Sequence, residues 1–443
     1  MSEQSIGTSD QLKDPDYEVP MVPRIALGLQ HVLAMFVSNV TPSIIIAGAA
    51  GFAFGGEDMV FLIQMAMLFS GIATLFQTIG FGAVGARLPV MQGTSFAFVP
   101  IMISIVKAGG MASLMGAIVI AGLFHTLLGF IIGKIRHWFP PLVSGMIILA
   151  IGLYLLPVGI KYAAGGAAEF QMNAPEWGDI SKWGLALVVI FVSLGFKFFT
   201  KGIASSAEIL LGLIAGYLVG IFTGAVNFGG IAKAEWFAIP TPFKYGIEFS
   251  AVAIIGMCLI SIVSAIETVG DISAIAKGGA GREATDKELK GGTLAYGLGS
   301  AVAGVFGGLP NTSFSQNVGL ISMTGVMSRG VVTVSGIFLI ICGFIPKIGA
   351  IISAMPISVL GGGVILMFGM VVSASINMLS DVNWSRRNML ILATSLSFGL
   401  GLQAVPKSMQ HLPDSIEMLM TSGLLPVAVL AVVMNLLLPE DAD

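Results

Sequence analysis

The sequence predicts an all-α protein that crosses a membrane many times, and three observations carry this prediction. Of its 443 residues, 56% are hydrophobic and only 10% are charged, whereas a soluble domain has about 25% charged residues. Apolar runs repeatedly reach the roughly 20 residues that a helix needs to cross a bilayer core. Glycine is frequent, at 58 residues, as in membrane helices that approach one another closely.

Fourteen apolar segments can be counted as spans, seven in each half of the chain. They begin near Arg24, Met59, Pro89, Met111, Phe139, Trp183 and Ala207, and then near Ser250, Lys290, Ser313, Arg329, Met355, Arg387 and Met418. The chain thus divides into a polar tail (1–23), a first repeat (24–226), a polar connecting loop (227–249), a second repeat (250–438) and a short tail (439–443). The first tail is polar, lacks the features of a signal peptide, and is expected to be disordered.

The distribution of charge predicts the orientation. With the N-terminus in the cytoplasm, fourteen Lys and Arg residues lie on the cytoplasmic side and seven on the other. The positive-inside rule therefore favours both termini in the cytoplasm. The net charge of −3 gives no indication of a nucleic-acid partner.

The two halves share motifs at one offset. A Leu-Pro pair (88–89 and 309–310), a Thr-Ser-Phe tripeptide (94–96 and 312–314), a proline (140 and 356) and a glycine five residues after it recur 216–221 residues apart. An odd number of spans in each half inverts the second half relative to the first. Inverted repeats with a site at their interface are typical of secondary transporters.

The repeated motifs lie where the spans look least helical. Residues 88–99 (LPVMQGTSFAFV) favour an extended strand, and residues 307–319 (GGLPNTSFSQNVG) are too polar to face lipid. Non-helical backbone at this depth must be buried in protein or line a cavity, and a half-helix after each break would aim its first N–H groups at a site. The alternative is that both stretches are surface loops.

The segment from Ser250 to Ala276 holds a close pair of carboxylates within an apolar run, Glu267 and Asp271. Their i, i+4 spacing places both on one helix face, and Gly270 beside them is expected to let another backbone come near. Charged residues at membrane depth mark a pathway or site by default, and a buried carboxyl can exchange a proton near neutral pH. The alternative for Asp271 is a position near the cytoplasmic helix end, where it would only cap or anchor the helix.

Amide and aromatic side chains follow the two breaks. Gln316 and Asn317 follow the second break, and a Gln amide presents a donor beside an acceptor, which complements the edge of a heterocycle. Phe96 and Phe314 follow the two breaks symmetrically and suit stacking on a planar ligand. For both rings, packing is the alternative.

His31 follows Gln30 in the first span, where it can relay protons or make a structural hydrogen bond. The other histidines, His125, His137 and His411, lack the spacing of metal ligands. We therefore expect neither a metal site nor a cofactor. Cys258 and Cys342 lie in apolar stretches without motif spacing and are interpreted as packing residues.

With these residues in place, the chain resembles the nucleobase–ascorbate transporters, also called the second nucleobase–cation symporter family. The resemblance runs from about Arg24 to Pro439. Its most specific element is the stretch 316–325, where Gln-Asn-x-Gly is followed by Thr324 and Gly325. The Glu-x-x-Gly-Asp motif at 267–271 and the Gln-His pair at 30–31 also match.

The resemblance implies seven plus seven inverted spans in core and gate domains, usually as a homodimer. It implies short antiparallel β-strands in the third and tenth spans that meet at the site. Glu267 and Gln316 would hold the base, Phe96 would stack on it, and main-chain groups near Ser95 and Ser315, with Asn317 beside them, would complete the site. Gln316, Ser95 and Gly325 are similar to those of the xanthine and urate permease branch, with Thr324 and Phe314 as further positions that modulate specificity.

The expected function is therefore a carrier, not an enzyme, that imports xanthine, and also urate, across a bacterial inner membrane by proton symport. Proton coupling would rest on Glu267, Asp271 and His31, because Tyr296 stands where many purine carriers of this family have Asp, and Tyr does not exchange protons near neutral pH. Sodium coupling stays open. The alternatives are a uracil or ascorbate carrier, disfavoured by Gln316, and an anion exchanger, channel or receptor, disfavoured by Glu267 and the lack of an output domain.

Overall fold

The computed structural model describes residues 6–135, 140–166, 169–170 and 172–439. The expected span start near Phe139, the histidine at 137 and the outermost residues of both tails lie outside these ranges. Within them the chain is helical apart from two short strands.

The first half runs through ten helices and one strand. They are α1 (Ser9–Leu12), α2 (Met21–Ala49), α3 (Glu57–Thr78), β1 (Gln92–Thr94), α4 (Val99–Leu128), α5 (Ile132–Ile135), α6 (Pro141–Ala163), α8 (Ile180–Phe199), α9 (Ile203–Ser206), α10 (Glu208–Phe222) and α11 (Gly229–Lys233), counted among the described residues. The second half contains α12 (Ala251–Ala280), α13 (Asp286–Val305), β2 (Asn311–Ser313), α14 (Ser315–Thr324), α15 (Arg329–Gly343), α16 (Pro346–Ser353), α17 (Ile357–Ser380), α18 (Arg386–Ala404), the 3-10 turn η3 (Pro406–Met409), α19 (Asp414–Thr421) and α20 (Leu424–Leu437).

The chain is a polytopic membrane protein. In the described part of the chain, seven helices are long and apolar enough to cross a bilayer, and α15 with α16, which meet at 81°, make an eighth candidate. Helix α4 is broken at Gly110, whose φ of 71° and ψ of −174° are not helical. The parts before and after this break correspond to the expected third and fourth spans.

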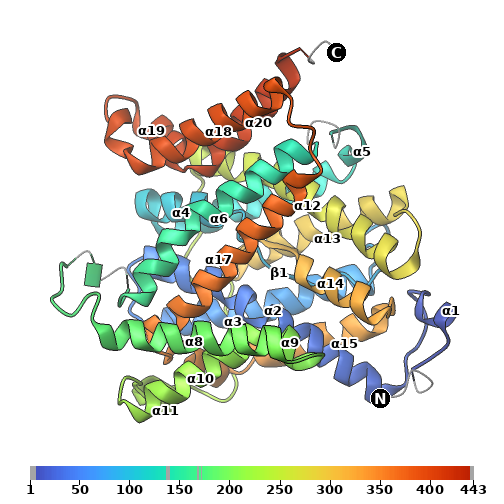
Figure 1. The fold of residues 1–443 in the computed structure, drawn as a ribbon, viewed down its shortest axis with the longest axis horizontal. Helices are drawn as coiled ribbons and strands as arrows, with labels where there is room; N and C mark the ends of the chain where they lie inside the picture. The colour runs from blue at the N-terminus through green and yellow to red at the C-terminus, as the bar shows by residue number, and fades with distance from the viewer. Residues whose placement is uncertain (1–5, 136–139, 167–168, 171, 440–443) are drawn as a thin grey trace.

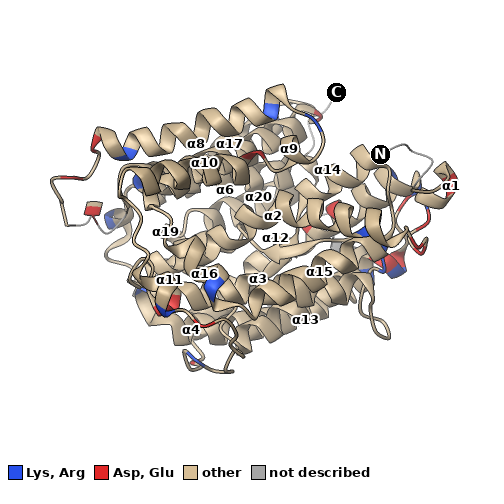
Figure 2. Ribbon diagram, turned by 90° about the horizontal axis from the view of Figure 1, so that it is seen from below, with Lys and Arg blue, Asp and Glu red and all other residues tan. Residues whose placement is uncertain are grey.

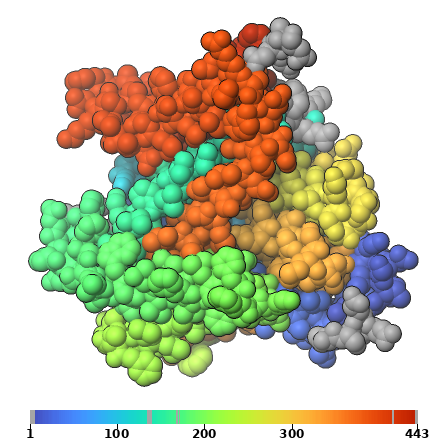
Figure 3. All heavy atoms as spheres, viewed as in Figure 1, coloured from blue at the N-terminus to red at the C-terminus, as the bar shows by residue number. Residues whose placement is uncertain are grey.

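The helices pack as two groups, each drawn from both halves of the chain. We call α2, α3, α4 and α12–α15 the core group, and α6, α8, α10, α17, α18 and α20 the gate group, because each set packs mainly within itself. In Figures 1 and 3, α17 (orange) crosses the face between α18–α20 (red) and α8 (green). The two names are taken from the core and gate domains that the family resemblance implies.

The N-terminal segment, residues 6–20, is ordered against the loop between α14 and α15. The backbone N–H groups of Met327 and Arg329 donate to the carbonyls of Leu12 (2.8 Å) and Pro15 (2.9 Å). Arg329 also binds the Asp16 carboxylate at 2.6 Å. The expectation of a disordered tail is thus wrong for these residues, because the loop offers backbone groups that the segment satisfies.

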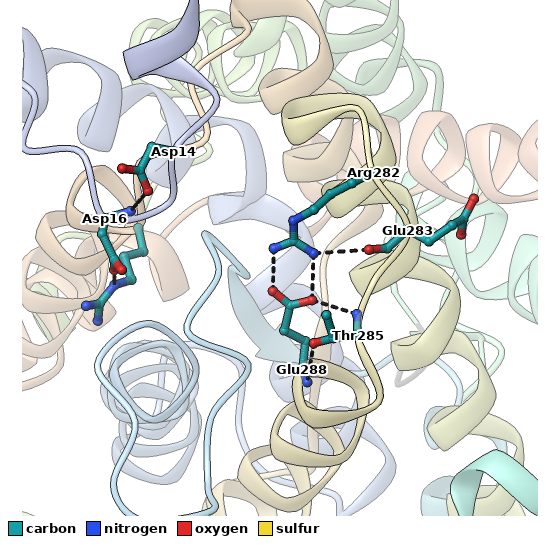
Figure 4. A network of polar contacts seen from close by, with 7 residues as sticks. Asp14, Asp16, Arg282, Glu283, Thr285 and Glu288 are labelled. Atoms are coloured by element: carbon teal, nitrogen blue, oxygen red, sulfur yellow. Dashed lines mark hydrogen bonds and ion pairs between the residues drawn. The ribbon is translucent and has the colours of Figure 1, made fainter.

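Charged residues are concentrated at helix ends and in loops, and the helices themselves are almost entirely of other residue types (Figure 2). One example is the turn between α12 and α13, where Arg282 binds both carboxylate oxygens of Glu288 at 2.9 and 2.6 Å (Figure 4). The hydrogen bonds that Arg282 donates to Glu288 raise the pKa of Arg282 above its usual value. Thr285 caps α13 beside this pair.

Candidate functional site

The two helix breaks meet as a pair of antiparallel strands at the centre of the core group. Gln92, Gly93 and Thr94 of β1 pair with Ser313, Thr312 and Asn311 of β2. All six residues are buried. The alternative of two surface loops is therefore wrong, and the predicted strands in the third and tenth spans are present.

Side chains from earlier helices hold the backbone of β1. The Gln92 N–H donates to Thr74 Oγ1 at 3.0 Å, and its carbonyl accepts from Ser70 Oγ at 2.5 Å. The Thr94 N–H donates to Asn39 Oδ1 at 2.8 Å. Strand β2 is held similarly, since the Asn311 N–H donates to Ser300 Oγ of α13 at 3.0 Å.

Gly93 is the point of closest approach between the strands and the core. A Cβ atom there would lie 2.4 Å from the Phe314 ring, 2.6 Å from Met35 Cε and 2.7 Å from Asn39 Oδ1. Phe314 is only 5% exposed and packs in an apolar cluster with Met35. The structure thus places Phe314 in the core, in agreement with the alternative that its ring serves packing and does not stack on a ligand.

Both carboxylates lie on α12, as predicted, with Asp271 in contact with the second break. Asp271 accepts hydrogen bonds from Ser313 Oγ (2.6 Å) and Ser315 Oγ (2.9 Å). It is buried and lies well inside the helix, so the alternative of a helix-end cap is wrong. Glu267 is partly exposed and lies beside Thr312 of β2.

The expected close backbone at Gly270 is not found. This glycine is exposed, and an added Cβ atom there would have nothing within 4 Å. Gly270 therefore lies on an uncovered part of the α12 surface, whereas Asp271 faces β2 and the start of α14.

Asn317 ties the start of α14 to the first long helix. Its Nδ2 lies 2.9 Å from His31 Nδ1 and donates to the His31 carbonyl at 3.0 Å. His31 is buried, so the structure gives it the hydrogen-bonded role that the sequence left open beside a proton relay. Gln30, its neighbour, reaches Ser206 Oγ near the gate group at 3.4 Å.

Gln316 is exposed at the first turn of α14, where helix N–H groups lack intrahelical acceptors. It lines a cavity of about 250 Å³ between α2 and α14 on one side and α8–α10 and α17 on the other. Neither Glu267 nor Phe96 is among the residues that line this cavity. The structure therefore brings Glu267 to the strands and Gln316 to the cavity, on neighbouring sides of β2 and α14.

Phe96 and Ser95 lie just after β1. The Phe96 ring meets Phe368 of the gate group edge-on, with centroids 5.3 Å apart. The Ser95 N–H already donates to the Pro310 carbonyl at 2.8 Å. Its buried hydroxyl makes no hydrogen bond within the described residues, and the Tyr296 hydroxyl lies near it.

Tyr296 lies behind the strands and is fully buried. Its hydroxyl is 2.7 Å from Ser264 Oγ of α12. Its ring stacks on His125, with centroids 3.8 Å apart. This tyrosine therefore fills a packed position between α12, α13 and α4.

Buried polar atoms without a partner collect around the strands. In the described part of the chain they include Ser95 Oγ, Thr268 Oγ1, Thr312 Oγ1, Asn317 Oδ1 and both amide atoms of Gln92. Buried polar groups normally have a partner. The three hydroxyls can donate or accept, the Gln92 nitrogen donates, and the Gln92 and Asn317 oxygens accept. This arrangement suits a polar ligand or ordered water.

The remaining predicted positions lie farther along α14 or in the core. Thr324 binds the Leu320 carbonyl of its own helix at 2.8 Å. Gly325 ends α14 with a φ of 67°, a conformation that favours glycine. Cys258 and Cys342 are free thiols packed in or against the apolar core, and no cluster of metal-binding side chains occurs among the residues described.

Sequence reasoning missed the residues that hold the strands. Asn39, Ser70 and Thr74 lie within long apolar helices and belong to no motif. The one signal in the sequence is that each of them is a polar residue within an apolar helix. Small hydroxyl residues are common in such helices, so this signal does not single them out.

Comparison with known proteins identifies close relatives over the full length. The model of a permease family, the xanthine/uracil permeases, matches residues 24–408. The putative purine permease CPE0397 of Clostridium perfringens is 38% identical, over 97% of this chain and 92% of the relative. The xanthine permease of Bacillus subtilis is 35% identical, over 93% of both chains, and the uric acid transporter UacT of Escherichia coli is 37% identical, over 93% of this chain and 85% of the relative.

Solved structures show the same fold at low identity. The transmembrane domain of the cyanobacterial bicarbonate transporter BicA superposes with a TM-score of 0.59 at 17% identity, over 93% of this chain and 97% of that one. Murine Slc26a9, an anion transporter in the inward-facing state, gives 0.64 at 14% identity, over 95% and 69%.

Proposed function

Because this chain belongs to the xanthine/uracil permease family, whose members are transporters and not enzymes, we propose that it imports xanthine, and also urate, by proton symport. Relatives of similar identity are named for purine, xanthine or uric acid. The observation that favours a purine is Gln316, a neutral amide at the start of α14 that faces a cavity. An amide pairs with both the N–H and the C=O groups of an oxidised purine.

We propose that the base binds against the two strands. Glu267 would accept from one N–H edge, Gln316 would pair with another edge, and Phe96 would stack on the ring. The support is that Glu267 lies beside Thr312 of β2 and that Gln316 lies in the first turn of the helix after β2. The first N–H groups of α14, near Ser315, and the Ser95 hydroxyl, which makes no hydrogen bond within the described residues, would supply the remaining contacts.

Proton coupling is assigned to Glu267, with Asp271 and His31 in supporting positions. Asp271 fixes Ser313 and Ser315 beside Glu267, and His31 fixes Asn317 beside Gln316. Protonation of Glu267 would change its contact with β2 and with the base. Sodium remains the alternative coupling ion.

The transport cycle would be alternating access, in which the core group moves against the gate group around the strands. Such movement would change the edge-on contact of Phe96 with Phe368 of the gate group. We further propose fourteen spans in two inverted repeats (24–226 and 250–438), both termini in the cytoplasm and a homodimer. Accessibility of single cysteines placed in the termini and chemical crosslinking in membranes test the last two points.

Uptake of radiolabelled xanthine in cells without their own carriers tests the function. We expect uptake that urate reduces, that uracil does not, and that a proton uncoupler abolishes, while replacing sodium has no effect. Glu267→Gln and Gln316→Ala should each abolish uptake at unchanged membrane expression. The exposed Glu248→Gln and Gln410→Ala are matched controls that should behave as wild type.

Normal xanthine uptake by either site variant would overturn the site assignment. Bicarbonate or chloride exchange without purine uptake would instead favour the second candidate, an anion exchanger. The fold shared with anion transporters is the observation behind that candidate, and the carboxylate of Glu267 at the strands argues against it.

A further inference from the structure

The cavity that reaches Gln316 has an ion pair on its opposite side. Lys197 of α8 and Glu208 of α10 both line it, with Nζ and Oε1 3.2 Å apart. Gln316 lines it from α14. The ion pair belongs to the gate group and Gln316 to the core group. The cavity therefore lies between this ion pair and the first turn of α14.

The two charges are unequally buried. The side chain of Glu208 is 11% exposed, whereas that of Lys197 is 50% exposed. An ammonium has three N–H donors, and among the described residues only Glu208 accepts a hydrogen bond from the Lys197 ammonium. Glu208 therefore holds the ammonium in place while at least one donor stays available to the cavity.

The rest of the cavity is largely apolar. Leu33, Val37 and Met370 are typical of its lining. Ligand sites combine an apolar wall with a few convergent polar groups. The volume of about 250 Å³ is just below the usual range for small-molecule pockets and is enough for one planar two-ring base.

We propose that this cavity is a second binding site, on the cytoplasmic side of the strands, for a monoanionic oxidised purine, in which Lys197 donates to the deprotonated edge of the base. The inference rests on the proposed function. Glu208 orients the ammonium, and Gln316 is shared between this site and the site at the strands. A purine moving inward would leave Glu267 and then pass between Lys197 and Gln316.

The site predicts that Lys197 distinguishes charged from neutral purines. At mildly acidic pH urate is a monoanion and xanthine is neutral. In detergent, where the cytoplasmic side is accessible, we expect Lys197→Gln to weaken the competition of urate against xanthine binding about tenfold, the size of one lost charge-assisted hydrogen bond, with less than about a twofold change in the Kd for xanthine. Lys197→Arg should retain urate competition, and the exposed Lys201→Gln, outside the cavity, should match wild type.

The outcomes separate the possible explanations. Equal losses for urate and xanthine, or no loss for either, would make the Lys197–Glu208 pair a purely structural link between α8 and α10 and overturn the proposal. Xanthine binding with which urate never competes in wild type would also overturn it. If the wild-type protein neither transports nor binds any purine in membranes, the proposed function itself fails.

Discussion

Asp271 accepts a hydrogen bond of 2.6 Å from the Ser313 hydroxyl, and this contact joins the helix of the two carboxylates directly to strand β2. The same carboxylate holds Ser315 at the start of α14. The geometry of the second break thus depends on one side chain of α12.

Asp271→Ala should destabilise the fold as well as abolish uptake. Two hydrogen bonds to a carboxylate are lost, each worth roughly 1.5 kcal/mol or more, and thermal unfolding in detergent measures the effect. Asp271→Asn keeps an acceptor and should lose less. The pair Asp271→Ala and Ser313→Ala should lose clearly less together than the sum of the single losses; an additive result would show that the contact carries no energy.

Asn317→Asp should impair transport more than Asn317→Ala. The present amide donates to the His31 carbonyl and lies against its ring nitrogen. A carboxylate would replace this donor by an acceptor facing another acceptor, whereas alanine only leaves a vacancy. Uptake and expression of both variants check this order, and wild-type uptake by Asn317→Asp would refute the assigned role.

Gly93→Ala should prevent formation of a functional strand pair. Its Cβ atom would lie 2.4 Å from the Phe314 ring, and overpacking of this kind costs about 1–3 kcal/mol. Gly195→Ala is the matched control, since nothing lies within 4 Å of its added Cβ atom. A second change, Phe314→Leu, should restore part of the lost expression and uptake; normal behaviour of Gly93→Ala alone would contradict the packing described.

Tyr296→Phe should retain proton-driven uptake. It removes the hydroxyl that contacts Ser264 and keeps the ring stacked on His125, so a loss of about 1 kcal/mol in stability is expected. The measurement is xanthine uptake with and without an uncoupler. Uptake by Tyr296→Phe that no longer responds to the uncoupler would make the hydroxyl part of the proton path.

The sequence predicts the parts of the site that depend on local pattern. The extended pattern at 88–99 predicts β1, and the spacing of Glu267 and Asp271 predicts that they share a helix face. The second strand and its pairing with β1 are implied by the repeated motif and the family resemblance. These features depend on residues close together in the chain or on a repeated motif.

Other parts depend on contacts between distant residues and could not be predicted. Residues 6–20 contain no pattern that predicts their contact with Met327 and Arg329, because these two N–H donors lie some 300 residues away in the chain. The partners of Asn317 and Tyr296 likewise come from other helices. The predicted close packing at Gly270 is wrong. A glycine in a helix permits close approach of another backbone but does not require that a neighbour be there.

The support of β1 by earlier helices bears on how the protein is made. Strand β2 is synthesised about 220 residues after β1, which at 5–20 residues per second is a delay of roughly 10–40 s. During that time an unpaired strand at membrane depth would be costly. Asn39, Ser70 and Thr74 precede β1 in the chain and already bind its backbone groups. These side chains can therefore take the place of the missing partner strand. They would keep β1 extended, with its backbone groups hydrogen-bonded, until β2 is synthesised.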